Sequence, residues 1–498
     1  MAVYLRPGVY VEESLNLATP VQSTTSQSIA AFIGYVKRGP VAPTLVTSWS
    51  QYVSLYGGWE NNSDMHIALL LFFSNGGSQA YVVRVVANDS VEATRTLNDR
   101  AGTPLETLTL NAANPGAWGN SINITIENGN EAGTFDLTVF YDGTAAANVV
   151  ERYTDLVMDP TADRYAVSII NSQSKYLMAV DENSTTALAT RIPAVGNNLS
   201  LAAGSNGATE PSHSSIAAAV TLFDTVRNSL VLNAPGVTES TSVNLLTSYA
   251  EDRGDVFVVI DPILGGASVS QIDRANEYTA TSYGAVYFPT VSIKDPAVTT
   301  PGVTKFVYPG GAIVGLYLST DASRGVFKAP AGLATRVGGA VSVGALTNTE
   351  LDNLNSNAAP VNAIRFVPGS GIVVMGARTL KGSYVDRYVP VRRTLIYLRK
   401  AVSDLSQFAV FEPNDERLWR RVTAAIEGFL TDFWRQGGLR GAVPSQAFYV
   451  KCDAEINPQA SIDAGIVNIE VGVALQRPAE FVVIKIGQFD GGTTVTVA

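Results

Sequence analysis

The stretch VTESTSVNLLTSYAEDRGDVFVVIDPI, residues 237–263, is the clearest indicator of fold class in this chain. It opens with polar residues typical of a helix start, and Gly254 is placed to end the helix. The apolar run 256–260 follows at once. A helix that feeds a short, wholly apolar strand is typical of a parallel sheet buried on both faces. We therefore expect an α/β body, with a central α/β domain over residues 207–381.

The same pattern occurs earlier in the chain. IAAFIGYVKRGP at 29–40 has the length of a buried strand and ends at Gly39 and Pro40. Helical candidates follow at 48–58 and 65–74, and AYVVRVV at 80–86 predicts another strand. Residues 23–95 are thus expected to form an α/β segment. The pattern leaves open whether this segment packs with the central α/β domain or with the C-terminal domain.

Residues 96–206 differ in character from the segments on either side. TLTLNAAN, SINITIEN and FDLTVFYDG alternate with a period of two and are separated by Gly, Asn and Pro. We predict an inserted β-rich domain here.

The C-terminal part predicts an α+β domain over 382–486. YVPVRRTLIYL at 388–398 reads as a strand, NDERLWRRVTAAIEGFLTDFWRQ at 414–436 as a helix, and two long strands ending in EFVVIKIGQF at 480–489 as the close of the domain.

Both termini predict extended arms, over residues 1–22 and 487–498. VYLRPGVYVE near the start and DGGTTVTVA at the end alternate like strands. An isolated strand exposes unpaired N–H and C=O groups and therefore needs a sheet edge to join. The residues expected to make these pairings are Val3, Tyr4, Val9, Tyr10, Val11, Thr494, Val495, Thr496 and Val497.

Composition excludes several classes of protein. Of the 498 residues, 46% are hydrophobic and 16% charged, and the formal net charge is -10, which opposes nucleic-acid binding. Cys452 is the one cysteine, so neither a disulfide within the chain nor a thiolate metal site is expected. We expect no cofactor and no metal. The sequence begins without a signal-peptide pattern and has no membrane-length apolar run, which predicts a soluble protein without membrane insertion.

The expected helix 414–436 has two contrasting faces. Its core-facing stripe recurs at spacings of three and four residues: Leu418, Val422, Ile426, Phe429 and Phe433. The opposite face carries bulky cations separated by small residues: Arg417, Arg421, Ala424, Gly428 and Arg435. Guanidinium groups so spaced could pair with carboxylates on a closely approaching partner. A solvated helix face explains the pattern equally well.

A second basic stretch contains Arg378, Lys381, Arg387, Arg392, Arg393, Arg399 and Lys400. Strand alternation would put Arg392 and Arg393 on opposite faces. Ordinary surface or inter-subunit ion pairs are therefore favoured over a dedicated anion site.

Enzyme-like signals are weak. Gly369 and Gly371 fit a turn before a buried strand better than a dinucleotide loop. His213 lies among serines in a polar linker, and Cys452 fits a packed strand residue. Strand-flanking aspartates are read as turn and cap residues: Asp252, Asp255 and Asp261. We predict no catalytic site and no enzymatic activity.

Several motifs together are similar to those of the phage tail sheath protein family. They are PGVYVEE, FIGYVKRGP, NGGSQAYVVRV, NPGAWGNSI, KAPAG, GIVVMGARTL, YVPVRRTLIYL, FEPNDERLW, AFYVKCDAEIN and RPAEFVVIKI. They follow the family's order along almost the whole chain, and the C-terminal third is the most specific part.

The resemblance implies a subunit that stacks in hexameric rings, as a six-start helix around an inner tail tube, and that shortens on a signal from the baseplate. It further implies arms that add strands to neighbours' C-terminal domains, which lie next to the tube. It also implies that the inserted β-rich domain faces outward, where insertions are tolerated. The implied partners are other copies, the tube protein, and baseplate and tail terminator proteins. The implied location is the virion tail, assembled in the host bacterial cytoplasm. DNA ejection is the expected outcome in a phage.

Contraction without a fuel site requires energy stored at assembly, and it requires hinges between arms and bodies. Gly487, Gly491 and Gly492 are the expected hinge positions. Two alternatives stay open. One is a hydrolase whose arms serve only oligomerisation, and the other is a static structural protein such as a tail tube or surface-layer subunit.

Overall fold

The computed structural model describes residues 28–58, 63–298, 300–382 and 386–480, together with the short strands at 489–490 and 493–494. These residues form a mixed α/β multidomain protein with two compact units. The central unit comprises residues 28–319 and 330–387 of the described chain. The C-terminal unit comprises 320–329 and the residues from Tyr388 onward.

The central unit is built on an eight-stranded sheet with the order β18-β17-β13-β12-β11-β1-β3-β2. Neighbouring strands from β17 to β3 run parallel, and the edge strands β18 and β2 are antiparallel to their neighbours. Side chains of β11, β12 and β13 are all buried, as expected for a sheet covered on both faces. The strands are β1 (Ile29–Tyr35), β2 (Thr44–Val46), β3 (Ala80–Val85), β11 (Leu230–Asn233), β12 (Val256–Ile260), β13 (Gly284–Phe288), β17 (Val361–Val367) and β18 (Gly371–Val374).

The pairing of β1 shows that the early α/β segment packs with the central α/β domain. It pairs with β11 on one side, where Ile29 lies opposite Leu230, and with β3 on the other, where Ala30 lies opposite Ala80. The early α/β segment is therefore part of the central sheet. The expected helix and strand of the opening stretch are α5 (Ser240–Arg253), which ends at Gly254 with a φ of 73°, and β12.

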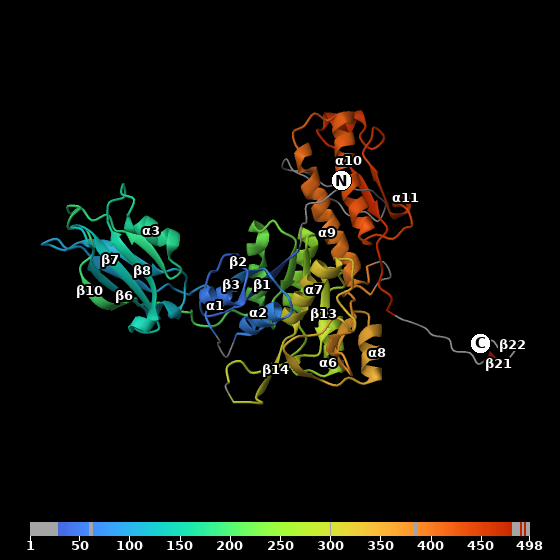
Figure 1. Cartoon of the computed structure of the whole chain (residues 1–498), viewed down its shortest axis with the longest axis horizontal. Coiled ribbons are helices and arrows are strands. Elements are labelled where there is room, and N and C mark those ends of the chain that lie inside the picture. Colours follow the sequence, from blue (N-terminus) through green and yellow to red (C-terminus); the bar gives the residue numbers. More distant parts are fainter. Residues whose placement is uncertain are drawn as a thin grey trace. The chain divides into compact units, whose positions relative to one another are not determined.

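Helices lie around the central sheet (Figure 1). Two of them approach unusually closely, because a Cβ on Gly311 of α7 would lie 2.1 Å from the backbone oxygen of Ala68 in α2. Glycine is required at that crossing. The helices are α1 (Trp49–Tyr56), α2 (Asp64–Ser74), α4 (His213–Ala218), α6 (Ser268–Asn276), α7 (Gly310–Arg324) and α8 (Asn348–Ser356), with the 3-10 helix η3 (Ala219–Thr225). A small antiparallel sheet adds β14 (Val291–Lys294), β15 (Thr304–Val307) and β16 (Ala340–Val343).

The stretch expected to be β-rich folds into two antiparallel sheets, ordered β10-β6-β7-β8 and β4-β5-β9 (Figure 1). They enclose a core of their own that includes Ile124, Leu137 and Leu110. The helix α3 (Ala166–Gln173) was not expected there. The strands are β4 (Thr94–Asn98), β5 (Glu106–Ala112), β6 (Ile122–Asn128), β7 (Phe135–Tyr141), β8 (Val149–Leu156), β9 (Leu177–Asp181) and β10 (Gly196–Ser200), with the 3-10 helices η1 (Ala117–Ser121) and η2 (Ala146–Asn148).

Arg84, near the end of β3, joins this β-rich part to the central sheet. The side chain is 2% exposed. Its guanidinium donates to the carbonyl oxygens of Val36 (2.7 Å), Lys37 (2.8 Å) and Gly39 (3.2 Å), and to that of Pro115 (2.7 Å) in the NPGAWGNSI motif. Buried backbone carbonyls and a buried cation thus satisfy one another.

Arg38 makes a second connection between the same two parts. Its guanidinium carbon lies 4.7 Å from the ring centre of Tyr141 and 4.6 Å from that of Tyr176, with Trp118 at 5.7 Å. It also donates to the carbonyl oxygen of Ser54 at 2.5 Å. A second hydrogen bond runs from its guanidinium to the hydroxyl of Tyr176 at 3.0 Å. The arginine is therefore held in an aromatic cage by cation–π attraction and two hydrogen bonds.

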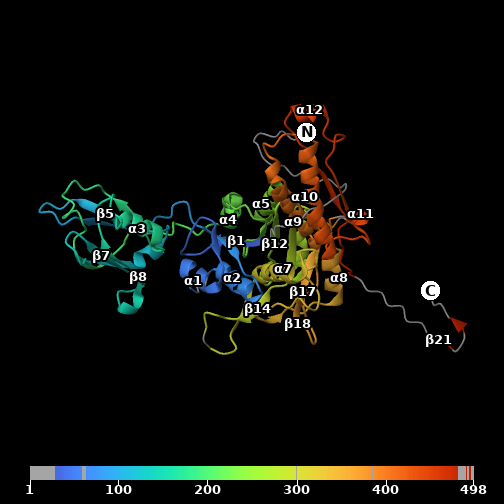
Figure 2. The same cartoon turned by 45° about the horizontal axis from the view of Figure 1, so that its top comes forward.

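The C-terminal unit contains α9 (Val389–Ser406) and α10 (Glu416–Arg435), which lie side by side in Figures 1 and 2. The predicted strand over 388–398 is wrong, because these residues begin α9. Pro390 lies in the first turn, where a missing N–H is tolerated, and buried Thr394 and Leu398 recur with helical spacing. The remaining elements are the 3-10 helix η4 (Gln407–Ala409), α11 (Pro444–Ala447), β19 (Phe448–Lys451), α12 (Gln459–Asp463) and β20 (Glu470–Val473).

Of the two long closing strands, the one predicted to end in EFVVIKIGQF lies mostly outside the described residues, and the other is shorter than expected. β19 and β20 are short and pair with each other, with Phe448 opposite Val473. Residues 481–488 lie outside the described residues. Further on, β21 (Phe489–Asp490) and β22 (Thr493–Thr494) pair antiparallel on either side of Gly491 and Gly492.

Candidate functional site

The helix α10 has the buried face that its sequence predicts. Leu418, Val422, Ile426, Phe429 and Phe433 are all buried in one cluster. They pack with residues of α9 and β19, among them Leu398, Ala401 and Phe448. Asp415 caps the helix by accepting a hydrogen bond from the backbone N–H of Leu418 at 2.9 Å. The opposite face of α10 is thereby fixed in an outward orientation.

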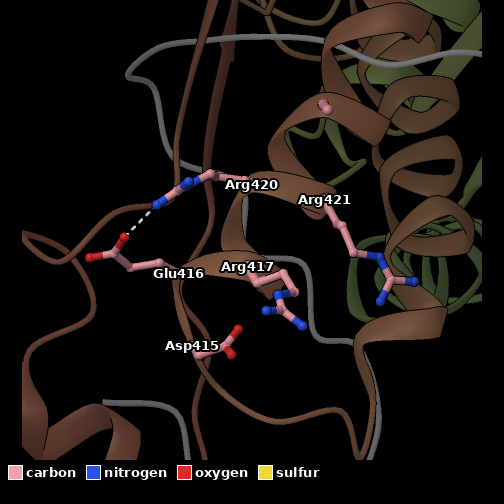
Figure 3. Close-up of a pocket in the computed structure, with 6 residues that line it drawn as sticks. Asp415, Glu416, Arg417, Arg420 and Arg421 are labelled. Carbon is pink, nitrogen blue, oxygen red and sulfur yellow. Dashed lines mark hydrogen bonds and ion pairs between the residues drawn. The ribbon is translucent and has the colours of Figure 1, made fainter.

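Three of the five residues predicted on that opposite face come together in the structure. Arg417, Arg421 and Ala424 are exposed and line one surface depression (Figure 3). Asp415, Glu416 and Arg420 complete its lining, and Arg420 was missed by the sequence argument. Gly428 is half-buried and Arg435 is exposed, but neither lines the depression. We call the surface lined by these six residues the arginine face.

Ion pairs occupy two of its three arginines. Arg420 pairs with Glu416 at 2.5 Å, with the two side chains 78% and 71% exposed (Figure 3). Arg421 lies 3.7 Å from Glu412, and its guanidinium carbon lies 4.9 Å from the ring centre of Phe408. Arg417 has no ion pair among the residues that the structure describes. Exposed pairs of this kind contribute about 0 to 1 kcal/mol, so all three guanidinium groups can exchange partners at low cost.

The second basic stretch is paired within the chain. Arg393 forms a two-pronged interaction with Asp321, including an Nη1 to Oδ1 distance of 2.9 Å, and its side chain is 2% exposed. Arg378 donates to the carbonyl oxygen of Asn355 at 2.7 Å, and Lys400 pairs with Asp404 one helical turn away. Arg392 and Arg393 are both buried on α9. The prediction that they lie on opposite faces of a strand is therefore wrong, because these residues are helical.

Most of the expected strand-pairing and hinge residues lie outside the described residues. Val3, Tyr4, Val9, Tyr10 and Val11 lie outside the described residues. So do Val495, Thr496 and Val497, and the glycines at 487, 491 and 492. Thr494 belongs to β22 and lies opposite Phe489.

The two histidines lie apart in different settings. Burial lowers the pKa of His66 to about 4, and its Nδ1 lies 2.8 Å from the hydroxyl of Tyr52. His213, at the start of α4, is half-buried and lies 3.7 Å from Glu239. The prediction of a solvated loop at His213 is wrong in secondary structure, because Ser212 caps a short helix there.

Asp261 is the most perturbed acid in the central unit. Its carboxylate is fully buried and accepts hydrogen bonds from the backbone N–H of Gly310 (2.7 Å), where α7 begins, and of Gly236 (3.2 Å). Burial raises its pKa to about 7. Asp261 therefore serves as a cap, as predicted, but the capped helix begins 49 residues later.

Other enzyme-like signals have structural explanations. Gly369, in the turn before β18, and Gly371, the first residue of that strand, have φ values of 82° and 83°, which confirms the predicted turn. Cys452 follows β19 directly, and burial raises its pKa to about 11. Within the described ranges, no group of three or more His, Cys, Asp or Glu residues is placed to hold a metal ion. No described helix is both long and apolar enough to cross a membrane.

Comparison with known proteins finds a match for the C-terminal part of the chain. Residues 387–488 match the family model described as phage tail sheath C-terminal domain. This part of the chain is thus similar to the C-terminal domain of phage tail sheath proteins. The tail sheath protein of Vibrio phage KVP40 is 33% identical over 105 residues, which are 21% of this chain and 15% of that protein. The match thus spans a small part of that curated sheath protein.

Solved sheath structures share the fold over most of the chain. The sheath complex of the extracellular contractile injection system PVC in its contracted state has 23% identity and a TM-score of 0.57, covering 98% of this chain and 99% of that one. The contracted helical sheath of the anti-feeding prophage has 23% identity and a TM-score of 0.59, covering 98% and 100%. The sheath tail protein Lin1278 from Listeria innocua has 13% identity and a TM-score of 0.60, covering 88% and 91%.

Proposed function

We propose that this chain is the structural sheath subunit of a contractile phage tail or of a related injection machine. The observation that carries the proposal is the match of residues 387–488 to the sheath C-terminal domain, which contains α9, α10 and the β19–β20 pair. The relatives named above are sheath components, and one similar structure is that of a baseplate assembly of the anti-feeding prophage. The subunit therefore works by assembly and not by catalysis.

Assembly proceeds through strand addition between copies. The β19–β20 sheet has only two strands in the described part of the chain, so it offers edges for further strands. The terminal arms, through Val3, Tyr4, Val9, Tyr10 and Val11 at one end and Thr494 to Val497 at the other, join such edges in neighbouring copies. Each added hydrogen bond contributes about 0.5 to 1.5 kcal/mol. Many weak bonds in a lattice of stacked hexameric rings, wound as a six-start helix, hold the sheath together.

Contraction follows from energy stored in that lattice. An extended sheath that is metastable repacks into a shorter, wider array when the baseplate releases it. Driving a two-state element from 1:99 to 99:1 takes about 5.5 kcal/mol, which many copies can supply cooperatively. The arms stay joined while the bodies move, with hinges at Gly487, Gly491 and Gly492. Contraction drives the inner tube through the target envelope.

The arginine face of α10 is the proposed contact with the inner tube. Its guanidinium groups are exposed and exchangeable, and the backbone of α10 is fixed by the buried stripe beneath. An acidic stripe on the tube would pair with them. Gly428 and Arg435 extend the same side of the helix and are kept in the proposal. Baseplate and terminator proteins cap the two ends of the sheath in the virion, which is assembled in the bacterial cytoplasm.

Electron microscopy of the purified chain tests the proposal. The full chain should form hollow, regularly striated tubes, and a variant truncated after Gly487 should stay monomeric. If both versions stay dispersed even when inner tube is added, the sheath proposal is wrong. A hydrolase would be monomeric or a closed oligomer, and a static tube subunit would form tubes of one fixed diameter and length.

A further inference from the structure

Asp261 is a buried acid that no cation neutralises. It follows β12 directly and is 1% exposed, and within the described ranges no lysine or arginine forms an ion pair with it. The charge beside it is that of another acid. The backbone N–H of Gly236 donates to Asp261, and a Cβ added to the same glycine would lie 3.1 Å from Oδ2 of Asp64. A buried carboxylate without a cation is costly to the fold unless it binds a proton.

Asn233, the last residue of β11, lies against this acid and is fully buried. Its Nδ2 donates to the carbonyl oxygen of Val259 at 3.0 Å and to Oδ2 of Asp261 at 3.3 Å. Its Oδ1 is a buried acceptor for which the described residues provide no donor. An acceptor left in this way costs free energy comparable to a lost hydrogen bond. The Asp261–Asn233 pair therefore has one acceptor too many and one hydrogen too few.

One proton on Asp261 satisfies both side chains. A neutral carboxyl has one O–H donor and keeps its carbonyl oxygen as an acceptor. The carbonyl oxygen keeps the bond from the backbone N–H of Gly310, while the hydroxyl donates to Oδ1 of Asn233 once that amide turns. The turn gives up the neutral bond to Val259, and protonation removes an uncompensated buried charge. Burial, and to a lesser extent the charge of Asp64, raises the pKa of Asp261 to about 7 against the lowering effect of its N–H donors.

The other titratable groups around the pair are two tyrosines and the charges near Asp64. Tyr308 precedes α7 and Tyr278 follows α6. Burial raises the pKa of Tyr308 to about 12 and also raises that of Tyr278, so both hydroxyls stay neutral near pH 7. Lys305 of β15 and His213 of α4 act on Asp64, whose charged form they favour. A test of Asp261 therefore has to separate its proton from one on His213.

We propose that Asp261 and Asn233 share one proton in the folded central unit, that this proton locks the start of α7, residues 310–314, and that its loss makes the start of the helix easier to open. The lock acts on a helix that both units share. α7 begins at Gly310 in the central unit, and its residues from 320 onward belong to the C-terminal unit, where Asp321 pairs with Arg393. The inference does not depend on the proposed function.

The direction of the effect follows from where the proton is held more tightly. When the start of α7 opens, water reaches the carboxyl of Asp261 and its pKa returns to the ordinary value of about 4. The closed state therefore binds the proton more tightly than the open state. Opening becomes easier as pH rises from about 4 toward 7, and the effect levels off above that.

Hydrogen exchange of the full chain, measured by mass spectrometry and corrected for the intrinsic exchange rate, tests the inference. In the wild type the amides of residues 310–314 should be about fivefold or more less protected at pH 8 than at pH 6. D261N replaces the acid proton with a carboxamide N–H, so at pH 8 it should keep the protection seen at pH 6 and melt no lower than the wild type. The first turn of α8 is an internal reference, because hydrogen bonds from Thr347 lower the pKa of Glu350 and keep this cap charged at both pH values.

Two further variants show which group holds the proton. D64N removes a charge that favours the protonated acid, so the loss of protection should shift to lower pH. H213Q should keep the wild-type pH dependence.

Three results would overturn the lock. The first is a D261N variant that melts below the wild type at pH 8 or loses protection at the start of α7, since Asp261 would then be an ordinary anionic cap. The second is a wild type that is equally protected at the two pH values, and the third is an H213Q variant without the pH dependence. If D261N does not fold, D64N decides the question, because an unchanged pH dependence in that variant contradicts a proton on Asp261.

Discussion

Arg84 and Arg417 show that the same type of side chain has two different roles in this molecule. Arg84 is buried in the central unit, and its guanidinium donates to four carbonyl oxygens drawn from two distant segments. Arg417 is exposed on α10 with no ion pair in the described chain. The first arginine is satisfied by the fold, and the second is available to a partner. The difference teaches that burial, and not the type of side chain, decides whether an arginine holds the fold together or is presented to a partner.

Loss of Arg84 should have the largest effect on stability. R84A would leave buried carbonyl oxygens without donors and would create a cavity, at a cost of about 3 to 5 kcal/mol. R417A should change the free energy of unfolding by less than about 0.5 kcal/mol. Urea unfolding monitored by tryptophan fluorescence and limited proteolysis would measure both. Equal effects of the two substitutions would contradict the comparison.

Acid should destabilise the central unit through His66. Its folded pKa of about 4 lies below the ordinary value of 6.5, so the protonated form is favoured by unfolding. The stabilising contribution is full above pH 6.5 and is lost as pH falls toward 4, by about 3 kcal/mol.

The measurement is the difference in stability between wild type and H66Q at each pH. This difference removes the opposing contribution of Asp261, whose raised pKa makes the fold less stable as pH rises from about 4 toward 7. Both histidines lie in the central unit, so the unfolding of the C-terminal unit should lack this dependence. A pH profile that is identical for wild type and H66Q would show that His66 is not the buried neutral group described.

Charge reversal on the arginine face should weaken docking without unfolding the protein. R417E combined with R421E should reduce assembly on purified tube at least tenfold, or about 1.4 kcal/mol, and more at low salt. The melting temperature should fall by no more than a few degrees, because only exposed contacts are lost. Unchanged assembly on tube would end the docking proposal for this face.

The smallest effect is expected at Arg420. Its pair with Glu416 is an exposed contact between residues one helical turn apart, so R420Q should cost about 0.3 to 0.5 kcal/mol. Thermal unfolding of the wild type and R420Q at low and at 1 M salt would measure it, since the difference should vanish when the pair is screened. A cost above about 1.5 kcal/mol would mean that Arg420 is part of the fold in the way that Arg84 is.

Local patterns in the sequence predicted much of this molecule. The apolar runs at β1, β3 and β12 and the stripe of α10 were recognisable because periodicity reports burial directly. α9 was missed because Val389, Val391, Thr394 and Ile396 have strand propensity, which tertiary packing overrode. The short lengths of β19 and β20 were also missed, because the alternation of apolar residues in the sequence does not show where the pairing of two strands ends.

Features that depend on distant partners could not be predicted. The carbonyl oxygens bound by Arg84 lie up to 48 positions away in the chain, and the cage around Arg38 is built from three different elements. The sequence predicted that Asp261 is a turn or cap residue, but it did not indicate that the capped helix is α7. The positive φ of Phe411 has no signature in the surrounding residues FEPND. Spacing identified the arginine face, but only the structure separates the paired arginines from Arg417.

Cryo-electron microscopy of the sheath assembled on its inner tube tests the central claim most directly. The account predicts that α10 lines the inner surface of the sheath, with Arg417 beside a tube carboxylate, and that arm strands of neighbouring copies extend the β19–β20 sheet. A reconstruction with α10 on the outer surface and β19–β20 unextended would contradict it.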